Sequence, residues 1–523
     1  MLPPTWNFPG CNIRMNKNSI KVRFLSTFIT NILRLGISFI SGLVVARILG
    51  PGEYGNFSFL LGSFASLAIL IDMSSSAAFY TFASQRKRGG QFFLYYAVWV
   101  LAQLLILLFL ALFLPISLRQ KIWIDHPLGL ILLALFAGFT MNQIWKFSAQ
   151  IGESIRDTIG VQVRNLALAV AYLACLGVMA KFHIVSIKTL FVLNIVLYLL
   201  FSALYARRIY QSGVLTKSHE DLRGIFKDFK IYCSPLVLCT VIGFLYSFSD
   251  YWFLQKFGGS IQQGYYAIGA RFSALSLIAT TSILHVFWKE IAEAYSLGNM
   301  ERVGMLYQRV SRSLYFMGAV ISCVMVPFSR EILALLLGSS YQAAWLPLCL
   351  MFLYPVHQSM GQITSTMLLA MGKTKIQGLI GIFFMVISMP IAYFLLAPKS
   401  AVVPGFQMGA IGLALKMVGC QILGANLTAF FVAKYTNTAF NWWYQFNVLF
   451  LLLPIGFLSK FFAQQIISLT SFGGFTILVM AVSGIIYLVN VAILIRYFPS
   501  IGGLNMDQIN HGLFWLRKRI RLT

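Results

Sequence analysis

The first long apolar stretch of the chain decides the class of fold. It runs from residue 31 to residue 62 and is NILRLGISFISGLVVARILGPGEYGNFSFLLG. About 20 mainly apolar residues are enough for a helix to cross a bilayer. The glycines and proline at 50–52 predict a tight turn, because glycine adopts positive φ and proline stops the preceding helix. Two membrane-spanning helices joined by a short hairpin are therefore predicted here.

The composition of the whole chain is that of an integral membrane protein. Of its 523 residues, 59% are hydrophobic and only 10% are charged. Soluble proteins are about 45–50% apolar and about 25% charged, so this chain lacks the polar surface to cover a water-soluble body. The net charge is +26, but the basic residues are spread among short loops. That pattern sets membrane topology and argues against a nucleic-acid partner.

Fourteen apolar stretches are long enough to span a membrane, so the predicted fold class is all-α and polytopic. The predicted spans are residues 24–48, 57–83, 93–116, 128–150, 160–181, 187–207, 231–254, 266–288, 310–329, 346–371, 376–397, 408–433, 446–463 and 472–497. With the N-terminus inside, 28 of the 40 Lys and Arg residues fall in inner segments or at the adjoining span ends, and eight fall in outer ones. Both termini are therefore predicted to be cytoplasmic.

The longest polar stretch divides the spans into two lobes of six helices plus two extra helices. In this linker Leu222, Ile225, Phe226 and Phe229 recur at helical spacing opposite charged residues, so it should lie along the inner membrane surface. Two six-helix lobes that both begin inside can only form a parallel repeat. The predicted domains are residues 1–23 (cytoplasmic segment), 24–207 (N-lobe), 208–230 (amphipathic linker), 231–433 (C-lobe), 434–497 (two further spans) and 498–523 (cytoplasmic basic tail).

A weak repeat connects the two lobes. The first span ends in Gly50-Pro51-Gly52 with Tyr54, and the seventh ends in Gly258-Gly259 followed by Gly264-Tyr265-Tyr266. Each is a glycine-rich outer turn that ends with tyrosine and opens a new helix. A tight hairpin alone explains the glycines. Their recurrence at equivalent places in both halves is the informative feature.

These motifs resemble those of a known family. The matching residues are Ala46-Arg47-Ile48-Leu49-Gly50-Pro51 with Tyr54-Gly55, Gly264-Tyr265-Tyr266-Ala267, Leu337-Gly338 with Tyr341 and Ala344, and Ala370-Met371-Gly372-Lys373. Together with fourteen spans they resemble bacterial polysaccharide flippases, the Wzx-like transporters of O-antigen and capsule repeat units. That family is similar in fold to lipid II flippases and to multidrug and toxin extrusion transporters. The sequence departs from it at Asp72-Met73-Ser74-Ser75-Ser76, where a Gly-Leu step is usual.

The resemblance implies a fold and a substrate. The fold would be two six-helix bundles around a central cavity that opens alternately inward and outward. The substrate would be a polyprenyl-diphosphate-linked glycan, moved across the bacterial inner membrane during polysaccharide or lipopolysaccharide biosynthesis. A polysaccharide polymerase is then a candidate partner, beside the lipid bilayer itself. No cofactor, metal site or catalytic group is predicted.

Polar residues within the first span mark a candidate site. Thr27, Asn31, Arg34, Ser38 and Ser41 recur at steps of four and three, which places them on one helix face. This stripe is either a seam between helices or the wall of a hydrated cavity. The arginine favours the cavity, because a charge in hydrocarbon costs about 2.5–3.5 kcal/mol.

Depth along the helices suggests two ion pairs. Arg34 and Asp72 lie at similar depth in the first two spans, and Asp250 and Arg271 in the seventh and eighth. As structural pairs they would only neutralise each other. As working residues the arginines would bind a diphosphate. Asp72 and Asp250 would then couple transport to protons or sodium.

Three further residues complete the candidate site. Lys416 has no evident acidic partner, so it should face a cavity or extend to the outer interface. His357 follows a helix-kinking proline, close to Gln358, Gly361, Gln362 and Ser365, in a helix that either moves or contacts sugar. Diphosphate or sugar binding is thus assigned to Arg34, Arg271, Lys416, Asn31 and Ser38, and coupling or gating to Asp72, Asp250, Arg47 and His357.

The sequence favours a flippase for lipid-linked oligosaccharides, which is not an enzyme. The main alternative is a cation-coupled small-molecule exporter of the multidrug and toxin extrusion type. Such an exporter should have carboxylates without arginines in its cavity. A membrane glycosyltransferase should have a sizeable outer loop, and none here exceeds about 16 residues.

Overall fold

The computed structural model describes residues 20–86, 88–211, 221–276, 278–438, 440, 442–469 and 476–503. The predicted N-terminal segment and basic tail lie mostly outside these residues, as does part of the predicted linker. Within the described ranges all regular structure is helical, as predicted, and there is no β-strand.

Long helices make up almost the whole structure, with short helical segments at their ends. Their bounds are α1 (Ile20–Asp72), α2 (Ser75–Gln85), α3 (Gly90–Phe113), α4 (Ile116–Ile122), α5 (Leu128–Phe139), η1 (Thr140–Ile144), α6 (Trp145–Ser154), α7 (Thr158–Lys181), α8 (Ile187–Gln211), α9 (Leu222–Cys233), α10 (Val237–Phe253), η3 (Leu254–Gly258), α11 (Gly259–Ser276), α12 (Ile278–Ser296), α13 (Met300–Met325), α14 (Ser329–Leu337), η5 (Ser339–Ala344), α15 (Trp345–Ala370), α16 (Thr374–Leu396), α17 (Gly409–Thr436), α18 (Trp442–Ser468) and α19 (Thr476–Tyr497).

The apolar helices are long enough to cross a membrane. The described residues contain 11 helical segments of sufficient length and hydropathy. Two of them, Thr27–Asp72 and Leu222–Ala274, each cover one predicted span and the beginning of the next. In each of the fourteen predicted ranges, most of the described residues are helical. The number of membrane crossings and the cytoplasmic placement of the termini stay predictions.

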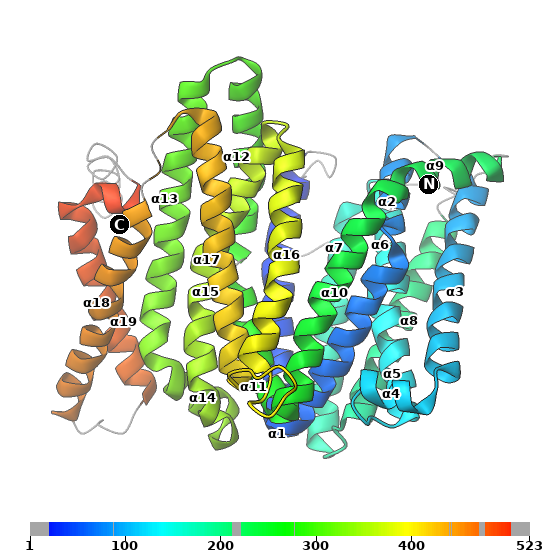
Figure 1. The fold of residues 1–523 in the computed structure, drawn as a ribbon, viewed down its shortest axis with the longest axis horizontal. Coiled ribbons are helices and arrows are strands. Elements are labelled where there is room, and N and C mark those ends of the chain that lie inside the picture. Colours follow the sequence, from blue (N-terminus) through cyan, green and yellow to red (C-terminus); the bar gives the residue numbers. More distant parts are fainter. Residues whose placement is uncertain are drawn as a thin grey trace, which may run out of the picture.

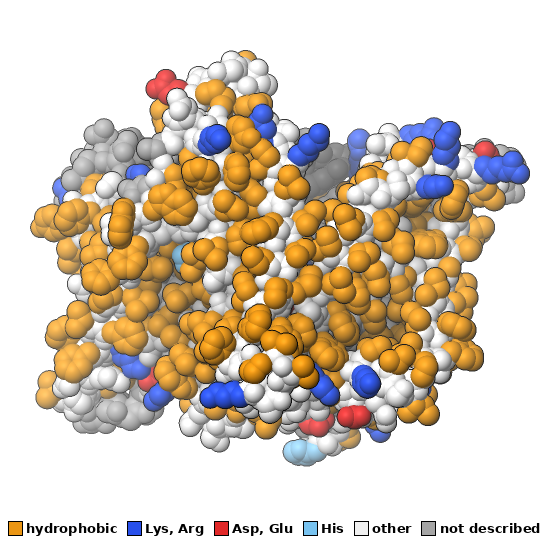
Figure 2. All heavy atoms as spheres, in the orientation of Figure 1, with side chains coloured by type: hydrophobic (Ala, Val, Ile, Leu, Met, Phe, Trp, Pro, Cys, Tyr) orange, Lys and Arg blue, Asp and Glu red, His pale blue; other side chains and the backbone are white. Residues whose placement is uncertain are grey.

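The surface of the molecule agrees with a membrane location. Figure 2 shows apolar side chains across the middle of the molecule and most Lys and Arg side chains towards its two ends. Leu94, Phe109 and Ile485 are 64%, 61% and 63% exposed. So many large apolar side chains in contact with water would cause aggregation. The chain is therefore a multi-pass membrane protein.

Two groups of helices, which we call the N-terminal group (α1 to α8) and the C-terminal group (α10 to α19), meet at the centre of the structure (Figure 1). The α3 helix stands at the outer edge of one group, and α18 and α19 stand at the outer edge of the other. Between the groups, α1 packs along both α10 and α11. We call the end of the molecule that carries α9 the α9 end. The opposite end carries the turn within α1 and is called the Gly50 end.

The two glycine turns predicted as a repeat have the same backbone conformation. Gly50 has φ 72° and ψ 171°, and Gly259 has φ 78° and ψ 175°. An L-residue with a side chain rarely adopts this conformation. Gly50 breaks α1 into two helices, with Pro51 in the first turn of the second. The repeat inferred from sequence is confirmed at these two turns.

The repeated turns pack against each other through glycine. A Cβ on Gly55 would lie 1.8 Å from the carbonyl oxygen of Ser260, and a Cβ on Gly264 would lie 2.1 Å from that of Pro51. Gly55 and Gly264 each lie five residues after the glycine of their turn, so the contacts are equivalent in the two halves. Only glycine allows this backbone contact, which closes the interface at the Gly50 end.

We expect Gly55→Ala to open this end, because its new methyl group has no space against Ser260. The measurement is the rate at which maleimide labels a cysteine placed at Asn56, whose side chain accepts a hydrogen bond from Gln255 across the interface at 3.0 Å. Labelling should accelerate by about tenfold or more, a shift of about 1.4 kcal/mol.

The matched control is Gly52→Ala. A Cβ there would lie 3.7 Å from its nearest neighbour, the hydroxyl oxygen of Ser260, which is ordinary contact. This variant should be labelled at the rate of the parent. Equal rates for Gly55→Ala and Gly52→Ala would contradict the proposed closure.

The amphipathic linker forms α9, which lies across the first group of helices (Figure 1). Asp221 caps it by accepting hydrogen bonds from the backbone of Arg223 and Gly224 at 3.1 and 3.2 Å. Phe229 is buried on an aromatic cluster that includes Phe82, whereas Phe226 is 58% exposed. One part of the predicted apolar face of α9 therefore packs against the protein, and another part is exposed.

Candidate functional site

The polar stripe of α1 faces a cavity of about 390 Å³. Arg34, Ser38 and Ser41 line it from α1, as the cavity hypothesis predicts, and Arg271 reaches it from α11. Asn31, also predicted for this site, is not one of the residues that line it. We name this space the arginine cavity. Its other polar walls are Asn142, Asn165, Tyr172, Asn194 and Tyr198.

The guanidinium of Arg271 lies against the backbone of α1. Its Nη1 donates a hydrogen bond of 2.9 Å to the carbonyl oxygen of Ser38. A Cβ on Gly42 would lie 1.3 Å from the same nitrogen. Glycine at position 42 therefore gives the guanidinium room to reach the helix. Through this contact one side chain joins the N-terminal and C-terminal groups of helices.

The guanidinium of Arg34 contains a buried nitrogen, Nε, which has no hydrogen-bond partner among the described residues. A buried donor without a partner is costly, so this nitrogen favours a ligand that accepts a hydrogen bond. Within the described part of the chain, no carboxylate lines the arginine cavity. Arg34 and Arg271 therefore contribute two positive charges to one cavity without an acidic neighbour on its wall.

The predicted pairing of Arg34 with Asp72 is wrong. The chain turns at Met73 and Ser74, which have φ of 44° and 64°. Asp72 then accepts hydrogen bonds from the hydroxyls of Ser75 and Ser76, at 3.1 and 2.7 Å, and so begins α2. Arg34 and Asp72 were predicted at equal depth in the membrane, but they do not form an ion pair, because this turn directs the Asp72 carboxylate to α2.

The cation closest to Asp72 is Lys146, which the sequence did not reveal. Its Nζ lies 4.0 Å from a carboxylate oxygen of Asp72 and donates to the Ser76 hydroxyl at 2.6 Å. The indole of Trp99 donates to the Ser75 hydroxyl at 2.9 Å. The departure from the family motif thus produces a polar cluster within the N-terminal group.

The predicted pairing of Asp250 with Arg271 is also wrong. Asp250 instead binds Lys416, whose Nζ donates to both carboxylate oxygens at 2.8 and 2.7 Å. The Lys416 side chain is 0% exposed, and its Nζ lies 4.3 Å from the ring centre of Tyr246. Both positions predicted for Lys416, facing a cavity or extending to the interface, are therefore wrong.

A second, mostly apolar cavity of about 470 Å³ adjoins the arginine cavity. Both cavities are lined by Ser38, Tyr54 and Arg271. The remaining walls lie between α1 and the pair α10 and α11, and include Leu35, Phe39, Ala65, Ala270 and Ala274. We name it the apolar cavity. The Arg271 guanidinium thus lies where a charged space meets an apolar one.

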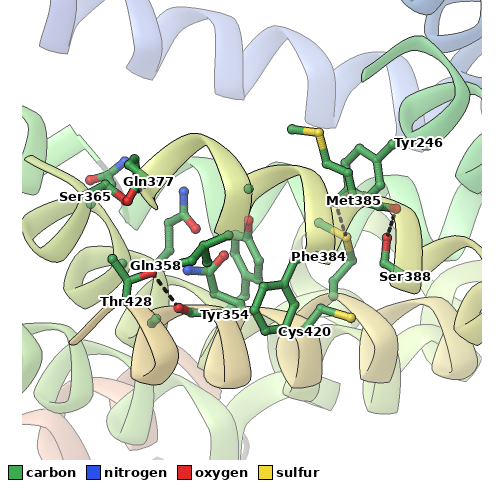
Figure 3. A pocket seen from close by; sticks show the side chains of 18 of the residues that line it. Tyr246, Tyr354, Gln358, Ser365, Gln377, Phe384, Met385, Ser388, Cys420 and Thr428 are labelled. Atoms are coloured by element: carbon green, nitrogen blue, oxygen red, sulfur yellow. Dashed lines mark hydrogen bonds between the residues drawn. The ribbon is translucent and has the colours of Figure 1, made fainter. Parts of the chain in front are cut away.

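A third cavity, of about 570 Å³, lies within the C-terminal group. Side chains from α15, α16 and α17 project into it, and Tyr246 of α10 contributes to one end (Figure 3). We name it the glutamine cavity. Gln358, Gly361, Gln362 and Ser365, which the sequence placed near a sugar or a moving helix, all line it.

His357 does not line this cavity. Its ring is buried against Tyr315, with ring centres 5.6 Å apart, and its Nδ1 has no hydrogen-bond partner among the described residues. Arg47 lies elsewhere, at the Gly50 end. Its Nη1 donates to the carbonyl oxygens of Leu335 and Leu336 at 3.4 and 3.5 Å. Arg47 thus joins the N-terminal group to α14.

Sequence reasoning missed the α16 and α17 walls of the glutamine cavity. Gln421, Ala425 and Thr428 recur on α17 at steps of four and three residues, with Gly424 beside them. This is the same spacing that marks the stripe of α1. Small and uncharged residues at this spacing are as typical of a helix seam as of a cavity wall, so the pattern alone was not distinctive.

No protein-family model matches this sequence, and no curated protein matches it. Solved structures do match. The lipid II flippase MurJ, in an inward closed conformation, superimposes with a TM-score of 0.65 and 15% identity, covering 91% of this chain and 99% of that one. A MOP superfamily transporter from Pyrococcus furiosus has a TM-score of 0.51 and 13% identity, covering 80% and 96%.

At such low identity these matches show the fold alone. They confirm the part of the resemblance that concerns lipid II flippases and their structural relatives. The narrower assignment to polysaccharide flippases stays a prediction. The chain has the fold of the MOP-superfamily transporters.

Proposed function

We propose that this chain moves a polyprenyl-diphosphate-linked oligosaccharide from the inner to the outer leaflet of a bacterial cytoplasmic membrane. The observation that carries the proposal is the position of Arg34 and Arg271 on the wall of one cavity without a carboxylate beside them. A guanidinium offers paired N–H donors whose geometry matches phosphate oxygens. Two of them provide the charge that a diphosphate requires.

The physical task is to move charge and hydroxyl groups through a dry core. A diphosphate carries about two negative charges, and a cytoplasm-negative potential favours their outward movement by about 2.3 kcal/mol per charge per 100 mV. Desolvation is the larger obstacle. The arginine cavity would replace the lost water with guanidinium, amide and hydroxyl groups. The apolar cavity beside Arg271 would offer a wall for the first isoprenoid units.

Alternating access would use the interface between the two groups of helices. Contact at Gly55 and Gly264 closes the Gly50 end, which the topology predicts to be the outer end. We propose that Arg47 holds this end through α14. Asp72 and Asp250 have cationic neighbours in the chain itself, Lys146 and Lys416. Coupling to an external cation at Asp250 would require Lys416 to leave.

The exporter alternative is less well supported. A cavity for cationic drugs should present carboxylates, and none lines any of the three cavities in the described residues. The geometry therefore favours an anionic substrate.

Reconstitution in liposomes tests the proposal. The probe is a polyprenyl diphosphate that carries an oligosaccharide, and the readout is the fraction that an added, impermeant glycosidase can cleave. With the protein present, this fraction should rise from the outer-leaflet share to nearly all of the lipid. A fraction equal to that of protein-free liposomes would contradict the proposal. Gradient-driven ethidium transport without lipid movement would support the exporter instead.

A further inference from the structure

The glutamine cavity has the size of a ligand site and a distinctive chemistry. Its volume of about 570 Å³ falls within the roughly 300–1,000 Å³ that small-molecule sites occupy. Its polar walls carry amides and hydroxyls, which are Gln358, Gln362, Ser365, Thr366, Gln377, Ser388, Gln421 and Thr428. No Lys, Arg, Asp or Glu lines it in the described residues.

The amide of Gln377 has hydrogen-bonding capacity that the described residues leave unused. Gln377 donates from Nε2 to the Ser365 hydroxyl at 2.9 Å, but its Oε1 is buried and has no partner among the described residues. Gln421 makes a long contact of 3.5 Å to the His357 carbonyl oxygen. Gln358 points into the cavity (Figure 3). Buried polar groups without partners are rare in proteins, so they indicate a polar ligand or water.

Aromatic side chains share the same walls. Tyr246, Tyr354 and Phe384 line the cavity together with the amides. A pyranose has hydroxyls that both donate and accept hydrogen bonds, and it has C–H faces that pack against aromatic rings. An amide side chain is uncharged and also offers donors and an acceptor together, in fixed relative positions. A wall of amides beside aromatic rings therefore fits a neutral sugar better than a charged or purely apolar ligand.

The position of the cavity fits a glycan attached to a diphosphate. Gln377 lies in the first turn of α16, at the α9 end, and Ser388 lies eleven residues further along. At 1.5 Å per residue, the cavity extends about 16 Å along this helix. At the end of the cavity near Ser388, Tyr246 lies five residues before Tyr251, which lines the apolar cavity beside Arg271. One helix, α10, therefore contributes to both spaces, about 7.5 Å apart along its axis.

We propose that the glutamine cavity binds neutral sugar residues of the oligosaccharide whose diphosphate is held by Arg34 and Arg271. This inference rests on the proposed function and adds a second subsite to it. The diphosphate subsite would recognise any lipid diphosphate. The glutamine subsite would recognise the glycan. A substrate that lacks a sugar hydroxyl would leave a buried amide without a hydrogen-bond partner, and this weakens its binding.

The experiment blocks the cavity and compares two lipids. Gly381 lines the cavity, and a Cβ there would meet nothing within 4 Å, so Gly381→Leu fills the space without displacing the protein. Gly378 lies one turn earlier on α16, is exposed, and also has nothing within 4 Å. Gly378→Leu is therefore the matched control, because Gly378 does not line the cavity. Gln358→Ala is a second variant, which removes an amide without adding volume.

The two probes are the lipid-linked oligosaccharides extracted from the organism that carries this gene, and the same polyprenyl diphosphate with a single sugar. Gly381→Leu and Gln358→Ala should each slow translocation of the oligosaccharide by about tenfold or more. The single-sugar lipid should move at the rate of the parent protein within about twofold, since it leaves most of the cavity empty. Gly378→Leu should move both lipids like the parent.

The outcomes separate this inference from the proposed function. If the parent moves neither lipid, the proposed function fails and the subsite fails with it. If the parent moves both and Gly381→Leu moves the oligosaccharide equally fast, the subsite alone is overturned. Equal slowing of both lipids by Gly381→Leu, with normal yield and thermal stability, would also overturn it, because the cavity would then serve conformational change rather than sugar recognition.

Discussion

Replacing Arg34 or Arg271 by alanine is expected to slow translocation of lipid-linked oligosaccharide by about 10- to 150-fold in each case. Hydrogen bonds to charged groups contribute about 1.5–3 kcal/mol, and every 1.4 kcal/mol is a factor of about ten. Both side chains line the arginine cavity, which has no carboxylate among its described walls to compensate for either loss. The rate is measured in liposomes by the glycosidase assay described above.

Two controls distinguish diphosphate recognition from damage to the protein. Arg302→Ala removes a half-exposed arginine whose partner is Glu290 at 3.1 Å. Arg302 lines none of the three cavities, so this variant should leave the translocation rate unchanged. Arg34→Lys keeps the charge but loses the paired donors, so its rate should fall between those of the parent and Arg34→Ala. Normal translocation rates in both Arg34→Ala and Arg271→Ala would contradict the assignment of the diphosphate site to these two arginines.

Replacing Lys416 by methionine is expected to destabilise the protein by about 3–5 kcal/mol, because Asp250 would keep a buried charge without its partner. The double variant Asp250→Asn with Lys416→Met should recover most of this loss, since no charge then stays buried. The measurement is the thermal unfolding midpoint in detergent for the two single variants and the double variant.

A second ion pair of the chain serves as the comparison. Lys460 and Glu331 are 2.6 Å apart, but their side chains are 18% and 28% exposed, against 0% and 13% for Lys416 and Asp250. Lys460→Met should therefore shift the midpoint less than Lys416→Met does. Equal shifts, or a double variant no better than Lys416→Met alone, would show that Asp250 and Lys416 are not coupled.

The features that sequence predicted well are those that depend on periodicity and on glycine. The step of three and four residues placed Arg34, Ser38 and Ser41 on one face, and these residues line one cavity. Gly50 and Gly259 were recognisable as equivalent because a turn with positive φ excludes almost every other residue. Residue spacing and turn glycines are local features of the chain, so a single sequence is enough to detect them.

The ion pairs were not predictable in the same way. Depth along a span follows from counting residues, but the direction in which a side chain points depends on how the helices are rotated and on local breaks. The turn at Met73 and Ser74 directs Asp72 towards α2. Lys416 reaches Asp250 from α17, which is 166 residues away in sequence. Packing of whole helices decides such a contact.

The glutamine cavity illustrates the same limit. The sequence singled out His357, which follows a helix-kinking proline, together with uncharged residues that follow it. Those residues, among them Gln358, line the cavity, and His357 does not. Adjacent residues on a helix point about 100° apart, so His357 turns to Tyr315 while Gln358 faces the cavity. The chemical type of a side chain therefore does not show whether that side chain faces a cavity.

Binding of a lipid diphosphate tests the central claim most directly. The purified protein and the double variant Arg34→Ala with Arg271→Ala are titrated with polyprenyl diphosphate and, in parallel, with polyprenyl monophosphate. The parent should bind the diphosphate at least about tenfold more tightly than the monophosphate, and the double variant should bind both weakly and without preference. A double variant that retains the affinity and the preference of the parent would show that these guanidinium groups do not hold the diphosphate.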